Sequence, residues 1–156
     1  MASKGGDRIM ELKNRSQYLD KLISVQDMEV IKVVTGIRRC GKSSLLKLMM
    51  THLRKQGIME EQILSMNFES MQFADMDSKR LYQYVMERAP KGKRLYLFLD
   101  EVQKVRDWQD AVNSFRVDLD CDIYVTGSNA YLLSSELSTY LSGRYVETVS
   151  YTHLRA

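Results

Sequence analysis

The stretch TGIRRCGKSSLL, residues Thr35–Leu46, decides the fold that the sequence predicts. Within it, GIRRCGKS matches the phosphate-loop pattern G-x-x-x-x-G-K-[ST] at every fixed position. Such a loop turns its backbone N–H groups toward phosphate oxygens, and the following helix presents its positive end to the same anion. Lys42 is then placed to contact the β- and γ-phosphates, and the Ser43 hydroxyl to bind Mg²⁺.

The segments on either side of this loop support the same interpretation. IKVVTG, residues 31–36, is a β-branched run that predicts a strand. KSSLLKLMMTHLRKQG, residues 42–57, predicts a helix with Gly57 at its end. A plain glycine turn is the alternative, but the complete motif between a strand and a helix favours phosphate binding. The expected nucleotide-binding residues of the loop are Gly36, Ile37, Arg38, Arg39, Cys40, Gly41, Lys42, Ser43 and Ser44.

Three of these loop residues have side chains whose roles stay open. Arg38 and Arg39 lie outside the fixed pattern, so they either border the nucleotide or are solvated. Cys40 stands at a helix N-terminus, which lowers a thiol pKa and could make it a nucleophile. We favour the alternative that Cys40 is simply a small loop residue.

The rest of the chain alternates predicted strands and helices. Apolar runs predict strands over residues 63–69, 94–100, 122–127 and 144–151, and amphipathic stretches predict helices over residues 77–89, 106–119 and 130–143. RLYLFLD, residues 94–100, is apolar throughout, as is typical of a strand that is buried on both faces of a parallel sheet. This alternation predicts an α/β fold with a mostly parallel sheet.

A pair of carboxylates follows the most apolar strand. Asp100 ends LYLFLD and can hold Mg²⁺ through water. Glu101 comes next and can orient or deprotonate a water molecule near the γ-phosphate. An acidic pair alone could be a solvated strand end, but the phosphate loop upstream favours the functional role. The glutamate also argues against a nucleotide kinase, which needs an acceptor pocket instead of a water-activating carboxylate.

Polar residues also follow the next predicted strand, in IYVTGSNA. Ser128 and Asn129 can fix the attacking water or contact the γ-phosphate, and they can equally cap the helix predicted from residue 130. Arg144 can stabilise the transition-state charge, also in a neighbouring subunit, or be a surface arginine at the start of a strand.

The composition, with 44% hydrophobic and 28% charged residues, is that of an ordinary soluble globular protein. No apolar run is long enough to span a membrane, and the polar start MASKGGDRIMELKNR has no apolar export-signal core. Cys40 and Cys121 suggest no disulfide framework, so a cytoplasmic location is expected. His52 and His153 have no partners at metal-ligand spacing, so we expect no zinc site.

Three separated motifs make the chain resemble a known family. IKVVTGIRRCGKSSLL, YLFLDEVQ and TGSNAYLLSSELSTYLSGRYVE resemble bacterial and archaeal AAA-type P-loop ATPases, within the wider AAA+ and archaeal-ATPase group. Members are often described only as ATP-binding proteins with a nuclease-like C-terminal domain of unknown function. The resemblance covers roughly residues 11–148. It implies a three-layer α/β/α sandwich with ATP and Mg²⁺ as cofactors, for which we expect a five-stranded parallel sheet in the order 5-1-4-3-2.

The resemblance also implies roles for individual residues. Lys42 and Ser43 would bind phosphate and Mg²⁺, Asp100 would complete the metal site, and Glu101 would be the catalytic base. The remaining implied roles are a sensor at Ser128, a possible arginine finger at Arg144, and an adenine border that includes Arg15 and Tyr18.

The resemblance divides the chain into three parts. Residues 1–30 are expected to precede the core, and residues 31–148 to form it. Beyond residue 148 the sequence departs from the family pattern, so residues 149–156 are expected to be a tail outside the family. The helical lid and the C-terminal domain are then expected to be missing from this chain.

The predicted function is hydrolysis of ATP to ADP and phosphate with Mg²⁺. Two alternatives stay open, namely a nucleotide-gated module that switches a partner with little turnover, and a fragment of a DNA-handling motor. Residues 1–57 carry twelve Lys and Arg against five Asp and Glu, which suits nucleotide phosphates. Nucleic acid is a further option, although no basic–aromatic interleaving supports it. We expect ATP or ADP as ligand, an unidentified protein partner, a homo-oligomer as an option, and no membrane.

Overall fold

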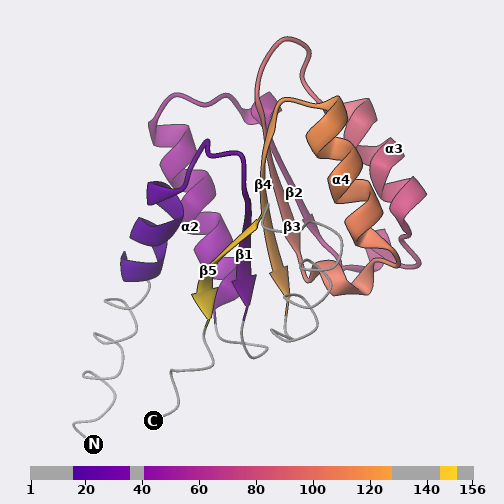
Figure 1. The fold of residues 1–156 in the computed structure, drawn as a ribbon, viewed down its shortest axis with the longest axis horizontal. Helices are drawn as coiled ribbons and strands as arrows, with labels where there is room; N and C mark the ends of the chain where they lie inside the picture. The colour runs from indigo at the N-terminus through magenta and orange to yellow at the C-terminus, as the bar shows by residue number, and fades with distance from the viewer. Residues whose placement is uncertain (1–15, 36–40, 128–144, 151–156) are drawn as a thin grey trace, which may run out of the picture.

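The computed structural model describes residues 16–35, 41–127 and 145–150 (Figure 1). In chain order the described elements are a helix over residues 16–24, β1 (Ile31–Thr35), α2 (Lys42–Lys55), η1 (Glu60–Gln62), β2 (Ile63–Asn67), η2 (Met71–Phe73), α3 (Ser78–Arg88), β3 (Leu95–Asp100), η3 (Val102–Lys104), α4 (Trp108–Asp118), β4 (Cys121–Gly127) and β5 (Tyr145–Ser150). The η elements are short 3-10 helices. The helix predicted over residues 130–143 lies outside the described residues.

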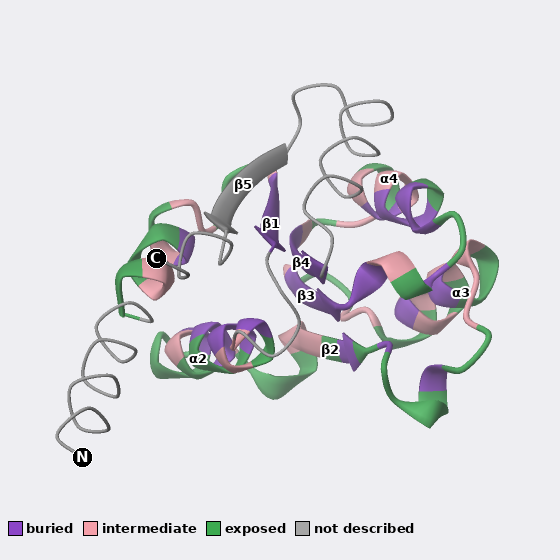
Figure 2. Ribbon diagram, turned by 90° about the horizontal axis from the view of Figure 1, so that it is seen from below, coloured by how far each residue is buried: buried purple, intermediate pink, exposed green. Residues whose placement is uncertain are grey.

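The strands form one parallel sheet in the order β2-β3-β4-β1-β5, which reads 5-1-4-3-2 from the β5 edge. α2 and the helix over residues 16–24 cover one face of this sheet, and α3 and α4 cover the other (Figures 1 and 2). The predicted α/β fold with a parallel sheet is therefore confirmed.

β3 shows why the apolar run LYLFLD becomes a central strand. All six of its residues are buried. Successive side chains of a strand point to opposite faces, so one strand supplies two cores. Leu95, Leu97 and Leu99 pack in the cluster that includes residues of α3 and α4. Tyr96 and Phe98 pack in the cluster that includes residues of α2. Helices on both faces account for the absence of polar alternation in this run.

The described part of the segment before β1 belongs to the same core. Leu22 is fully buried in the cluster that holds Leu45 and Met49 of α2. Tyr18 and Leu19, one turn earlier on the helix, are partly buried and pack against this cluster. The helix over residues 16–24 is thus held to the sheet by apolar contacts rather than attached as a free arm.

A buried ion pair joins β1 to β4 near the amino ends of these strands. Lys32 and Asp122 form a salt bridge in which both side chains are fully inaccessible to water. The Lys32 ammonium also donates to the backbone carbonyl of Met28 at 2.7 Å, and the Tyr124 hydroxyl donates to Asp122 Oδ2 at 2.7 Å. Burial lowers the pKa of Lys32, and the neighbouring Asp122 carboxylate partly opposes this effect.

Asp27 extends this network into the loop before β1. Its backbone N–H donates to Asp122 Oδ2 at 3.0 Å, and its carboxylate accepts from the Tyr96 hydroxyl at 2.7 Å. Arg94 Nε lies 3.1 Å from the same carboxylate. The resulting hydrogen-bonded network contains Lys32, Asp27, Asp122, Tyr124 and Tyr96. It ties the loop that follows the first helix to β1, β3 and β4.

Several predicted boundaries are wrong by a few residues. The strand predicted over residues 63–69 ends at Asn67, because the Asn67 side chain and carbonyl accept from the N–H groups of Glu69 and Ser70 and turn the chain. The helix predicted from residue 106 begins at Trp108, after Asp107 takes a left-handed conformation. β5 (Tyr145–Ser150) agrees to within one residue at each end with the strand predicted over residues 144–151.

Candidate functional site

The carboxyl ends of three parallel strands bring the predicted site residues to one edge of the sheet. Thr35, the last residue of β1, pairs with Gly127 at the end of β4. Asp100 ends β3, between β2 and β4. α2 begins only a few residues after β1, so its N-terminus lies at the same edge. Open parallel sheets bind their ligands at this kind of edge.

The start of α2 is built for an anion. Gly41 precedes the helix with φ of 84°, a left-handed conformation that favours glycine. No acidic residue lies in the first turn, and among the described residues no side chain caps the helix start. The first turn of α2 therefore carries no negative charge of its own that would oppose an anion at the positive end of the helix. Residues 36–40 of the loop lie outside the described residues.

Ser43 and Asp100 are in direct contact at the carboxyl end of β3. The Ser43 hydroxyl donates to Asp100 Oδ2 at 2.5 Å, although the two residues are 57 positions apart in the sequence. In the described residues no cluster of three or more His, Cys, Asp or Glu side chains forms a metal cage. Mg²⁺ in nucleotide sites instead takes one or two protein oxygens, phosphate oxygens and water. One hydroxyl and one carboxylate are oxygen ligands that fit this pattern.

Glu101 is held in an unusual backbone conformation. It is buried and has φ of 57°, in the left-handed region that residues other than glycine seldom adopt. The conformation begins the η3 turn and is fixed by a hydrogen bond from the Glu101 N–H to Thr126 Oγ1 at 2.9 Å. Such strain is typical of sites where a side chain must point in a set direction.

The Glu101 carboxylate has a different partner on each oxygen. Lys42 Nζ lies 3.7 Å from Oε1, and Gln103 Nε2 donates to Oε2 at 2.6 Å. A lysine that can reach a phosphate and a carboxylate that can accept a proton are thus neighbours. This arrangement can bind a phosphate chain and activate a water molecule beside it.

Thr126 is a site residue that the sequence analysis passed over in favour of Ser128 and Asn129. It is fully buried at the end of β4 and donates its hydroxyl proton to Asp100 Oδ1. Thr126 Oγ1 also accepts a hydrogen bond from the Glu101 N–H at 2.9 Å. One hydroxyl therefore fixes both neighbouring acids. The signal in the sequence is a lone polar residue within IYV-T-G, at the carboxyl end of an apolar strand.

Replacement of Thr126 by valine is expected to lower the free energy of unfolding by roughly 1–3 kcal/mol. Valine has a similar shape but leaves the buried Glu101 N–H without an acceptor. Urea unfolding measures the change. Thr51→Val is the matched control, because the Thr51 hydroxyl bonds the Lys47 carbonyl on the exposed face of α2, and its cost is expected to stay within about 0.5 kcal/mol. Equal stability of Thr126→Val and the wild type would disprove the bridging role.

The remaining predicted residues are only partly placed. Ser44 lies in the first turn of α2, and Tyr18 packs against the α2 side of the core, with the Lys21 ammonium 5.8 Å from its ring centre. The predicted site residues outside the described residues are Arg15, Gly36, Ile37, Arg38, Arg39, Cys40, Ser128, Asn129 and Arg144.

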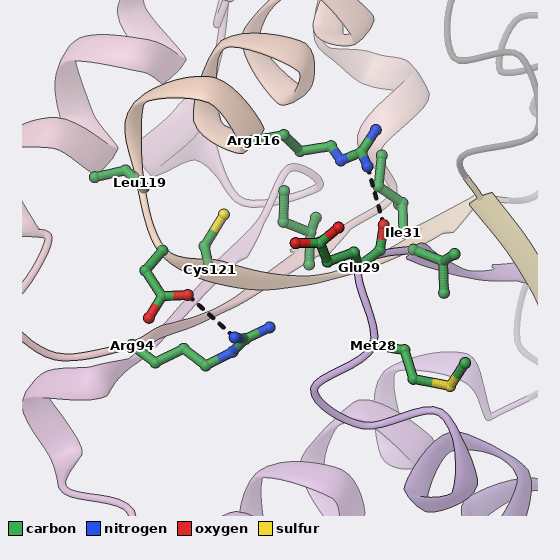
Figure 3. A pocket seen from close by; sticks show the side chains of 10 residues that line it. Met28, Glu29, Ile31, Arg94, Arg116, Leu119 and Cys121 are labelled. Atoms are coloured by element: carbon green, nitrogen blue, oxygen red, sulfur yellow. Dashed lines mark hydrogen bonds and ion pairs between the residues drawn. The ribbon is translucent and has the colours of Figure 1, made fainter.

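A hollow lies where β1 and β4 begin, away from the candidate site, and Figure 3 shows the residues that line it. It has a volume of about 170 Å³ and is lined by residues of the β1 and β4 starts, with Arg94 and Arg116. Both arginines are engaged, since Arg94 pairs with Asp120 at 3.0 Å and Arg116 donates to the Glu29 carbonyl at 2.9 Å. Burial raises the pKa of the Cys121 thiol to about 11, so this thiol stays protonated at neutral pH. The thiol is therefore not a reactive nucleophile in this hollow at neutral pH.

Comparison with known proteins supports the fold and identifies the family. The structure is similar to a chain in the structure of Drosophila ORC bound to AT-rich DNA and Cdc6, with a TM-score of 0.58. The similarity covers 98% of this chain and 61% of that one, at 12% sequence identity, and so concerns the fold. The likeness agrees with the α/β arrangement of helices and a parallel sheet. The AAA domain family model matches residues 29–154, and the chain belongs to this family.

The family match reaches residue 154, so it includes most of the segment that the sequence analysis placed outside the family. An uncharacterized protein of Haemophilus influenzae is 46% identical over 140 residues, which are 88% of this chain and 35% of that protein. Uncharacterized protein MJ1544 of Methanocaldococcus jannaschii is 27% identical over 141 residues, which are 89% of this chain and 30% of that protein. The chain thus spans about a third of these curated relatives. None of the described helices could cross a bilayer.

Proposed function

We propose that this chain binds ATP with Mg²⁺ and hydrolyses it to ADP and phosphate. The observation that carries the proposal is the contact of Ser43 with Asp100 at 2.5 Å. It joins the phosphate-loop helix to the acidic strand end, with Lys42 and Glu101 paired beside it. If the motif were only a glycine turn between a strand and a helix, there would be no reason for a hydroxyl, two carboxylates and a buried lysine to meet at one edge of the sheet.

Each side chain has a distinct task in this proposal. Lys42 binds the β- and γ-phosphates and offsets negative charge as the bond to the γ-phosphate breaks. Ser43 and Asp100 would hold Mg²⁺, which would supply further charge stabilisation when bound. Glu101 accepts a proton from the attacking water, while ADP departs with the electrons of the broken bond. Thr126 keeps both acids in place through its two hydrogen bonds.

Further parts of the proposal concern residues outside these contacts. Ser128 would contact the γ-phosphate or the water, and Arg144 would stabilise charge, in the same or a neighbouring subunit. Arg15 and Tyr18 would border the adenine. These roles rest on the family resemblance. A protein partner and self-association are proposed on the same ground.

Phosphate release from ATP, measured with Mg²⁺ and with a chelator, tests the proposed function. We expect Mg²⁺-dependent release and measurable affinity for both ATP and ADP. Tight nucleotide binding without phosphate release would instead indicate a nucleotide-gated switch. Absence of nucleotide binding at millimolar ATP would disprove both functions.

Lys42→Ala is expected to weaken ATP binding by roughly 10- to 100-fold, because it removes a charge-assisted hydrogen bond to phosphate. Titration with a fluorescent ATP analogue measures the affinity. Lys47→Ala is the matched control, since Lys47 is exposed on the same helix and its loss should leave affinity unchanged. Equal affinities of the Lys42 and Lys47 variants would rule out the phosphate role of Lys42.

A further inference from the structure

Gln103 is placed against the proposed catalytic carboxylate by the backbone that follows it. Glu101 takes a left-handed conformation, and η3 (Val102–Lys104) turns the chain immediately afterwards. The turn is closed by the Lys104 N–H, which donates to the Glu101 carbonyl at 3.1 Å. As a result the Gln103 side chain folds back on a residue two positions earlier, and its Nε2 donates to Glu101 Oε2 at 2.6 Å.

This contact holds one oxygen of the Glu101 carboxylate. With Lys42 near Oε1 and Gln103 on Oε2, the two oxygens are held by partners from different elements. A general base is effective only when it is within hydrogen-bond reach of the proton that it takes. Bases in catalytic sites are commonly oriented by a third group, which itself exchanges no proton. A neutral amide suits this task because it donates a hydrogen bond without titrating.

The other end of the same amide argues against a role in packing alone. Gln103 Oε1 is buried and accepts no hydrogen bond from the described residues. A buried acceptor without a donor is costly, and such groups are few in folded proteins. Methionine would fill the same space without that cost. At this position the hydrogen-bond donor of the amide therefore matters more than the volume of the side chain.

We propose that Gln103 is a positioning residue, which orients the Glu101 carboxylate so that it can accept a proton from the attacking water. The proposal rests on the proposed ATP hydrolysis. It deepens that function by assigning the group that holds the base. Gln103 touches neither the phosphates nor the metal in this assignment, and it acts through Glu101.

The first test replaces Gln103 by methionine, which has a similar length and no donor. The kcat for ATP hydrolysis is expected to fall roughly 10- to 100-fold, the worth of a hydrogen bond to a charged group. The affinity for ATP should stay within about 2-fold, because phosphate contacts are untouched. Lys104→Met is the matched control on the same turn, and its partly exposed pair with Glu69 should matter little. Gln103→Glu keeps the shape but sets a second carboxylate against Glu101, so it should lower kcat at least as far.

The second test separates positioning from a general disturbance of the site. In a Glu101→Gln background there is no carboxylate to orient, so Gln103→Met should cause no further loss in single-turnover hydrolysis of labelled ATP. Groups that act as one unit show such non-additivity. Full additivity of the two substitutions would overturn the proposal, as would an unchanged kcat in both Gln103 variants. Failure of the proposed function looks different, since the wild type itself would then release no phosphate.

Discussion

Glu101→Gln is expected to slow ATP hydrolysis by roughly 100- to 10,000-fold, the usual contribution of a general base. Glutamine has nearly the same size but cannot take a proton from water. ATP affinity should change little, because Lys42 and the helix start supply the phosphate contacts. Single-turnover phosphate release and a separate binding titration measure the two quantities.

The matched control for this substitution is Glu60→Gln, since Glu60 is exposed and forms an ion pair with the exposed Arg54, far along the chain from the site residues. This control should hydrolyse ATP at the wild-type rate. If Glu101→Gln and Lys42→Ala lost binding to the same degree, the division into a phosphate-binding lysine and a water-activating glutamate would be wrong. A variant that binds ATP and still turns it over normally would rule out Glu101 as the base.

Lys32→Met is expected to lower the free energy of unfolding by roughly 3–5 kcal/mol. The substitution leaves the Asp122 carboxylate buried without its counter-charge at the amino end of β4. Tyr124 and the Asp27 N–H still donate to Asp122, but two neutral donors do not replace a cation. Urea unfolding measures the change when the free energy of unfolding is extrapolated linearly to zero denaturant.

Two further variants make this prediction specific. Adding Asp122→Asn to Lys32→Met removes the stranded charge and keeps an acceptor for Tyr124, so the double variant should be more stable than Lys32→Met alone. Arg54→Met breaks an exposed ion pair with Glu60 and should cost at most about 1 kcal/mol. If Lys32→Met cost no more than Arg54→Met, the buried pair would have no special role in stability.

The sequence predicted the central part of the site because its signals are local and its geometry follows from topology. Lys42 and Ser43 belong to one short motif, and Asp100 and Glu101 follow an unmistakable buried strand. Parallel strands place their carboxyl ends at a common edge, so the contact of Ser43 with Asp100 follows once the strands are identified.

Other features depend on backbone detail that no periodicity reveals. Gln103 reaches Glu101 only because Glu101 is left-handed, a conformation that its residue type does not indicate. Ser128 and Asn129 drew attention because they are more polar than Thr126. The contact of Thr126 with Asp100 depends on the register of β4 against β3, which the sequence does not reveal. The pair of Lys32 with Asp122 joins positions 90 apart, each within an ordinary strand pattern.

The placement of β1 between β4 and β5 has a consequence for the synthesis of the chain. β1 is made early, but its neighbours in the sheet are made last among the described strands. The partner of Lys32 emerges 90 residues later, a delay on the order of 5 to 20 s at ordinary translation rates. During that time β1 has two unpaired edges and a lysine without its carboxylate. The nascent chain is then most open to wrong pairing, and chaperones that shield short apolar strands should act on it before β4 is complete.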